Sequence, residues 1–222
     1  MPSTKPLLLI DSPEAPPLVG IFLYPLHKKG RSRHGISWME TTAMTPTERE
    51  GLLREMDQTR ENLLRAVEGL SREQLEYREA PDRWSVAEIL EHIAFVEQGI
   101  LGRVTEALRS SSAGSNAGGL AGDDVALRSA LAESRKRGLQ APEAIRPKGR
   151  WPLEQLLPEF EASRRRTRDF VAAATGDLRG RSLPHAQFGA LDCYQWLVLI
   201  ASHCDRHRAQ IEKVKASAGF PR

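Results

Sequence analysis

The chain has 222 residues, of which 40% are hydrophobic and 27% are charged, a composition typical of soluble globular proteins and unlike that of disordered or fibrous chains. Its most apolar stretch, residues 7–26, is interrupted by Asp11, Glu14 and four prolines, so it lacks the roughly 18 apolar residues of a membrane span. The apolar run at residues 7–10 is shorter than a signal-peptide core, and no small-residue cleavage site follows it. We therefore expect a cytoplasmic protein with no membrane partner.

The formal net charge is +3, and residues 1–43 account for +2 of it, because five Lys and Arg residues there stand against three Asp and Glu residues. The rest of the chain carries only +1 and has no basic stripe, so we expect no nucleic-acid partner. The two cysteines, Cys193 and Cys204, are separated by about 16 Å along one predicted helix, which is too far for a disulfide. This pattern fits a reducing compartment.

Residues 1–43 show no helical or strand periodicity, and we expect them to form an N-terminal extension, disordered or outside the domain, that precedes a single domain at residues 44–222. The first helix is predicted to begin after an N-cap at Thr45 and to end near Gly69. The second begins after Ser85, where a Ser-x-x-Glu capping box ends at Glu88.

Residues 110–122 form a Ser, Gly, Ala and Asn tract that predicts a loop, and a short helix at 123–137 would use Val125, Leu127 and Leu131 as its apolar face. A third long helix is predicted at about 152–174, with Pro158 as its kink or its true start. The last helix follows an N-cap at Asp192 and ends near residue 217. The sequence thus predicts an all-α four-helix bundle with a long connection between its second and third helices and no convincing strand.

Three histidines occupy positions where surface histidines are not expected. His203 and His207 are four residues apart, so both rings project from one face of the last predicted helix, a spacing by which two imidazoles can bind one metal ion. His92 falls on the apolar face of the second helix. An i, i+4 pair also occurs by chance, and a single buried histidine is more often a hydrogen-bonded core residue, so the spacing alone does not decide between ligands and core.

Two segments make the chain resemble the DinB superfamily of four-helix-bundle metalloproteins. Residues 84–93 read Trp-Ser-Val-Ala-Glu-Ile-Leu-Glu-His-Ile, and residues 203–211 read His-Cys-Asp-Arg-His-Arg-Ala-Gln-Ile. The Phe-Gly-Ala-Leu turn at 188–191 is also similar to the family. The resemblance extends from about Met44 to the C-terminus and implies that His92, His203 and His207 bind a divalent metal ion such as Zn, Ni, Fe or Mn.

The resemblance also implies a range of activities. Members of the family are similar to thiol transferases and isomerases that use a low-molecular-weight thiol such as bacillithiol, mycothiol or glutathione, and others are described only as metal-dependent hydrolases. We therefore expect a metal-dependent thiol S-transferase or hydrolase that acts on a small electrophile, with such a thiol as a cosubstrate. The alternatives are a metal-binding or structural bundle without turnover and, as the family's name suggests, a DNA-damage-associated DNA-binding protein. The family's bundles often pair, so a homodimer is expected.

Several other residues have competing interpretations. Glu88 precedes His92 by one turn but is explained by its capping box, and Gln210 either lines the metal site or is an exposed helix residue. His185 is expected at the surface or at a pocket rim, and Cys204 is expected in the core. The arginines at 164–166 and 168 spread around the predicted helix, which favours a solvated face over a phosphate-binding groove.

Overall fold

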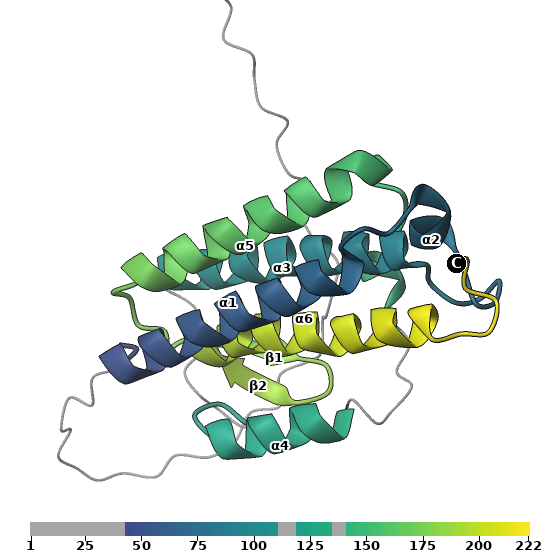
Figure 1. Cartoon of the computed structure of the whole chain (residues 1–222). Helices are drawn as coiled ribbons and strands as arrows, with labels where there is room; N and C mark the ends of the chain where they lie inside the picture. The colour runs from purple at the N-terminus through teal and green to yellow at the C-terminus, as the bar shows by residue number, and fades with distance from the viewer. Residues whose placement is uncertain (1–42, 111–118, 135–140) are drawn as a thin grey trace, which may run out of the picture.

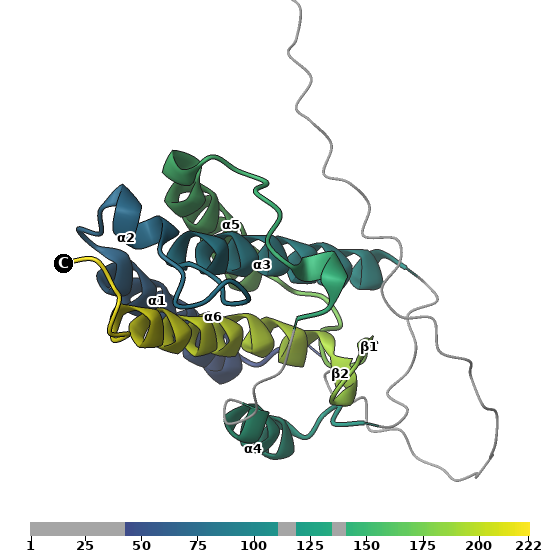
Figure 2. The same ribbon diagram turned by 90° about the vertical axis from the view of Figure 1, so that its right-hand side faces the viewer.

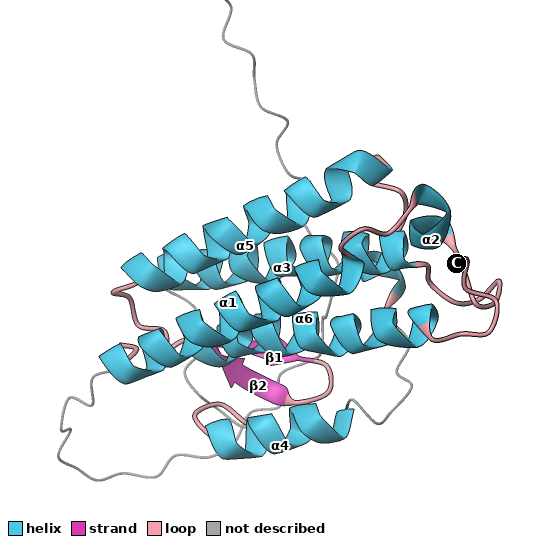
Figure 3. Cartoon of the chain, in the orientation of Figure 1, coloured by secondary structure: helices cyan, strands magenta, loops and turns pink. Residues whose placement is uncertain are grey.

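The computed structural model describes residues 43–110, 119–134 and 141–222. The predicted extension and most of the predicted Ser and Gly loop lie outside these ranges. Four long helices form a bundle, with α1 and α3 each packed against both α5 and α6 (Figures 1 and 3). They are α1 (Pro46–Val67), α3 (Val86–Arg109), α5 (Leu156–Ala173) and α6 (Cys193–Lys215). The predicted all-α four-helix bundle is confirmed.

Three of the long helices begin at capping boxes. In a capping box, the side chain of the N-cap residue accepts a hydrogen bond from the backbone N–H three residues later, and the side chain of that later residue accepts one from the backbone N–H of the N-cap residue. The N-cap residues are Thr45 for α1, Ser85 for α3 and Asp192 for α6. These reciprocal bonds satisfy amide groups that the first turn leaves without partners. The predicted starts of all three helices are confirmed.

α5 begins later than the sequence predicted. A 3₁₀ turn, η2 (Leu153–Gln155), precedes the helix, and the first residue of α5 is Leu156. Pro158 is then the third residue of the helix, where its missing N–H group removes no hydrogen bond. Of the two roles considered for Pro158, marking the true start is the one the structure supports.

The connection from α3 to α5 spans residues 110–155, as long as predicted, and contains α4 (Asp124–Ser134) and the 3₁₀ turn η1 (Glu143–Ile145). α4 lies on the side of α6 away from α5 (Figures 1 and 2). Leu127 and Leu131 are buried as predicted, but Val125 is 78% exposed, so its place on the apolar face was wrong. A short helix, α2 (Arg72–Glu76), joins α1 to α3.

A two-stranded antiparallel hairpin precedes α6, which corrects the expectation that the chain has no strand. β1 (Ser182–His185) pairs with β2 (Gly189–Asp192) in a register that places His185 opposite Gly189. Gly189 has a φ of 71°, which glycine adopts at little cost. Each strand has four residues, too few for an alternating apolar pattern to be recognised, so neither strand could be predicted from the sequence.

The expected solvated arginine face at residues 164–168 is partly wrong. Arg165, Arg166 and Arg168 are exposed, but the side chain of Arg164 is only 1% exposed and pairs inside the bundle with Glu97, which is 2% exposed. α5 turns this one position toward α3 and α1. The charged side chain of Arg164 is therefore buried, and it is hydrogen-bonded to Glu97 on α3 and to the Met56 carbonyl on α1. No helix among the described residues is long and apolar enough to cross a membrane.

Candidate metal centre

The three predicted histidines come together where α3 packs against α6. His92 lies in the second turn of α3, and His203 and His207 lie one turn apart on α6. The ring centroids are 5.0 Å apart for His92 and His203, 4.7 Å for His92 and His207, and 4.4 Å for His203 and His207. The structure therefore joins residues that are more than a hundred positions apart in the sequence.

One nitrogen from each ring can be chosen so that all three atoms lie within 4.8 Å of one another. Nε2 of His92 is 3.1 Å from Nε2 of His203. Two nitrogens that each lie about 2.1 Å from one ion are separated by roughly 3.0 Å at a right angle and roughly 3.4 Å at a tetrahedral angle. The separation between His92 and His203 falls within that range, so this pair fits a single divalent ion, and His207 is near enough to complete a site that could hold one.

Neighbouring groups bind the outer nitrogens of two rings. Nδ1 of His92 donates a hydrogen bond to the carbonyl oxygen of Ile145 at 2.7 Å, and Nδ1 of His207 donates to Oε1 of Gln210 at 2.9 Å. In a neutral imidazole with the proton on Nδ1, the lone pair is on Nε2. Metal-binding histidines in proteins almost always have such an outer partner, which fixes both the tautomer and the ring orientation.

Burial also keeps the rings neutral. It lowers the pKa of His92 to about 4 and that of His207 to about 3, and it lowers the pKa of His203 well below its ordinary value. The charge of Arg206 lowers all three pKa values further. The neighbouring histidine rings also lower the pKa of His203 and that of His207. At neutral pH the site therefore presents three uncharged donors, the protonation state that metal binding requires.

Trp84, the residue before the N-cap of α3, forms one wall of the cluster. Its ring centroid is 4.8 Å from that of His92 and 6.3 Å from that of His207, where the two ring planes are nearly parallel. The Trp-Ser start of the helix thus has two roles: Ser85 caps the helix, and Trp84 packs against the imidazoles that the helix helps to bring together.

A buried carboxylate anchors the segment that carries the Ile145 carbonyl. Glu91 is 3% exposed, and its Oε1 accepts hydrogen bonds from the backbone N–H of Lys148 at 2.7 Å and from Nη1 of Arg150 at 2.6 Å. Its Oε2 accepts from the N–H of Gly149 at 2.9 Å. Neither Glu91 nor the Ile145 carbonyl was predicted from the sequence. A backbone carbonyl has no sequence signal, and a glutamate next to a helix histidine is unremarkable by itself.

The other residues considered from the sequence have clear positions. Glu88 belongs to the capping box, as predicted, and it also pairs with Arg78. Gln210 contacts His207 directly, so it belongs to the site. Cys204 is fully buried in the apolar core, and burial raises the pKa of its thiol to about 11, so the thiol stays protonated.

His185 is not part of the cluster. It lies on β1 with its ring stacked on Phe188 at a centroid distance of 4.6 Å and tilted against Trp196 at 5.1 Å. Burial, together with the charge of Arg103, lowers its pKa to about 4. The ring therefore packs within a small aromatic group beside the hairpin.

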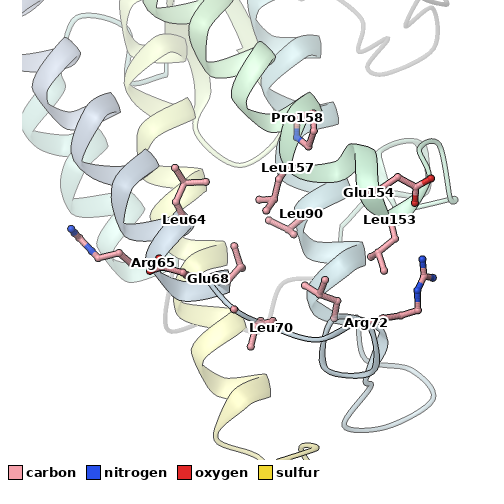
Figure 4. Close-up of a pocket in the computed structure, with 13 residues that line it drawn as sticks. Leu64, Arg65, Glu68, Leu70, Arg72, Leu90, Leu153, Glu154, Leu157 and Pro158 are labelled. Carbon is pink, nitrogen blue, oxygen red and sulfur yellow. The ribbon is translucent and has the colours of Figure 1, made fainter.

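A hollow of about 700 Å³ lies between the end of α1, α2 and the start of α5 (Figure 4). Leucines form most of its wall, including Leu64, Leu70, Leu153 and Leu157, and Arg65 and Arg72 also line it. None of the three clustered histidines lines it. Its size suits a small ligand, but the chemistry of the chain is concentrated elsewhere, at the histidines.

Comparisons with known proteins agree with this architecture. The chain is 23% identical over 150 residues to the uncharacterized protein YuaE of Bacillus subtilis, an alignment that covers 67% of this chain and 88% of YuaE. The solved structure of YfiT from Bacillus subtilis superimposes with a TM-score of 0.54 at 15% identity, over 86% of this chain and 95% of that one. YfiT is described as a probable metal-dependent hydrolase with an unusual four-helix bundle topology. The sequence pattern of the DinB superfamily matches residues 55–211, and the chain therefore belongs to the DinB superfamily.

Proposed function

We propose that this protein is a metal-dependent enzyme that activates a thiol or a water molecule for attack on a small electrophile, as a thiol S-transferase or a hydrolase. The observation that carries the proposal is the convergence of His92, His203 and His207, whose donor nitrogens lie within 4.8 Å of one another. The description of YfiT as a probable metal-dependent hydrolase supports the hydrolase branch. Membership of the DinB superfamily supports both branches.

Three neutral imidazoles leave the charge of a bound ion uncompensated and leave coordination positions for other ligands. A divalent ion held there supplies Lewis acidity, which lowers the pKa of a thiol or water ligand toward neutrality. The contribution of the chain is to present three nitrogens, two of them in the correct tautomer through the bonds of His92 to Ile145 and of His207 to Gln210. Trp84 packs against the rings of His92 and His207. A thiol is acidic enough to need less help from a general base than water does, which favours the transferase branch.

The test begins with metal analysis of untagged protein that has not passed over a metal column, followed by an activity screen with and without added thiols. Electrophiles such as epoxides and unsaturated acids probe thiol transfer, and activated esters probe hydrolysis. One equivalent of metal together with turnover that a chelator abolishes and metal restores supports an enzyme. A metal-loaded protein that turns over neither class of substrate would instead favour the binding or structural alternative.

A further inference from the structure

We propose that Glu91 is a positioning residue for the metal centre: it holds the backbone of residues 145–150 so that the Ile145 carbonyl fixes His92 in the tautomer with a free Nε2. This inference rests on the proposed metal site and assigns a task to a residue outside the cluster of three histidines. Glu91 is next to His92 in the sequence, but its side chain points to the 145–150 segment, where it accepts three hydrogen bonds.

The three bonds require a carboxylate. Oε1 accepts from the Lys148 N–H and from Arg150, and Oε2 accepts from the Gly149 N–H. An amide at this position has only one acceptor oxygen, and its NH₂ group would face a backbone donor. Glu91 itself is only 3% exposed, so water has little access to the acceptor end of these bonds.

The backbone of the segment is shaped for this anion. Gly149 has a φ of 70°, a value that side-chain-bearing residues rarely adopt. Successive amides in such a turn point the same way and form a concave anion-binding nest, here occupied by the Glu91 carboxylate. The same glutamate is therefore both the anchor of the segment and the partner of two of its backbone N–H groups.

The anchored segment reaches the metal site through Ile145. Arg150, held by Glu91, also donates to the Arg146 carbonyl at 2.8 Å, and its guanidinium lies 3.7 Å from the ring centroid of Phe95 on α3. Arg150 thus connects the Arg146 carbonyl, next to Ile145, to Glu91 and Phe95 on α3. The Ile145 carbonyl is thereby held 2.7 Å from Nδ1 of His92, and this bond places the ring proton on Nδ1.

The experiment compares Glu91→Gln with the parent protein by two measurements. In the metal-free protein, long-range ¹H–¹⁵N NMR reports which nitrogen of His92 carries the proton; the parent is expected to show the Nδ1–H form and Glu91→Gln a mixture. Titration with Co²⁺ against a competing chelator measures affinity, which we expect to fall about 10–100-fold, with an altered visible spectrum.

Matched controls separate positioning from a general loss of stability. Glu88→Gln makes the same change three residues earlier on α3, where glutamine can also complete the capping box, and is expected to keep the parental tautomer and Co²⁺ affinity. Arg150→Gln leaves both backbone bonds to Glu91 in place and is expected to weaken Co²⁺ binding less than Glu91→Gln. If Glu91→Gln does not fold, Glu91→Asp replaces it, because aspartate keeps the charge but is one methylene too short to reach the segment.

A Glu91→Gln protein with the parental tautomer and Co²⁺ affinity would overturn the inference, as would an equal loss in Glu88→Gln. Failure of the proposed function can be distinguished from failure of this inference. If the parent binds Co²⁺ but has no turnover, the enzyme proposal is lost while the positioning role stands on affinity and tautomer. If the parent binds no metal, the metal site is lost, and the NMR comparison alone decides whether Glu91 controls the His92 ring.

Discussion

At the scale of single residues, the histidine cluster makes the sharpest prediction. Replacing His92, His203 or His207 by alanine should remove bound metal while the helical circular dichroism spectrum is retained, because apolar side chains provide most of the packing between the helices. Metal content and far-ultraviolet spectra of the three variants check this. His185→Ala, a histidine outside the cluster, is the control and should keep its metal. Full metal occupancy in His92→Ala would contradict the three-histidine site.

The buried ion pair predicts a large effect on stability from one arginine. Arg164 donates to both carboxylate oxygens of Glu97, at 3.0 Å from Nε to Oε1 and 3.0 Å from Nη2 to Oε2, and also to the Met56 carbonyl and the Thr59 hydroxyl. Arg164→Met would leave the buried carboxyl group of Glu97 without its partner. We expect the free energy of unfolding to fall by about 3–5 kcal/mol in urea denaturation.

The neighbouring position supplies the control for this prediction. Arg165→Met makes the same chemical change one residue later on the exposed face of α5, where surface substitutions usually change stability by less than about 0.5 kcal/mol. Similar effects at the two positions would show that the Arg164 pair contributes nothing specific to stability.

At the scale of elements, the hairpin depends on a close backbone approach. Gly189 has a φ of 71°, and a Cβ atom built there would lie 2.8 Å from the Cα atom of Gly119. Gly189→Ala should therefore destabilise the protein by about 1–2 kcal/mol, because strain and crowding act together. Thermal unfolding monitored by circular dichroism measures this change.

A second glycine should respond in the opposite direction. Gly51 lies inside α1, and a Cβ atom there meets nothing within 4 Å. Gly51→Ala should raise the free energy of unfolding by about 0.5–1 kcal/mol, because alanine loses less conformational entropy in a helix. Equal changes at Gly51 and Gly189 would mean that the hairpin geometry has no effect on stability.

At the scale of the whole molecule, the buried imidazoles make stability depend on pH. The pKa of His92 is about 4 in the folded protein, below its unfolded value of about 6.5, so the unfolded chain binds more protons between these values. The stability due to neutral His92 is complete above about pH 6.5 and is lost as the pH falls toward 4. For the metal-free protein we expect His92 alone to lower the free energy of unfolding by about 2 kcal/mol between pH 7 and pH 5.

Urea unfolding at the two pH values measures this dependence. His92→Leu removes the titrating group and places an apolar side chain at the buried position, so its stability should fall less than that of the parent over the same interval. The same decrease in both proteins would assign the pH dependence to other groups.

The N-terminal boundary gives a second prediction at this scale. Met44 is buried in the core and Thr45 caps α1, so a chain that begins at Met44 keeps every described contact of the first helix start. Deleting residues 1–43 should leave the melting temperature and the metal content nearly unchanged. A fall of many degrees would show that the apolar residues at 7–26 stabilise the bundle.

Much of the fold was predictable from the sequence because its signals are local. Capping boxes at Thr45 and Ser85 use side chains within three residues of the amides they satisfy, and apolar spacing marks the buried face of each helix. The spacing of His203 and His207 likewise follows from helix geometry. These features depend on neighbours along the chain, so the sequence by itself determined the four long helices, the starts of three of them and the pairing of two of the three site residues.

Features that depend on contacts between distant segments could be established only from the tertiary structure. Packing of α3 against α6 brings His92 to the pair on α6, and packing of α5 turns Arg164 inward to Glu97. The bond from His92 to Ile145 and the anchoring of that segment by Glu91 involve backbone groups, which are chemically alike at every residue. Their roles arise from position in space, and hydrogen bonds and burial are set only when the bundle closes.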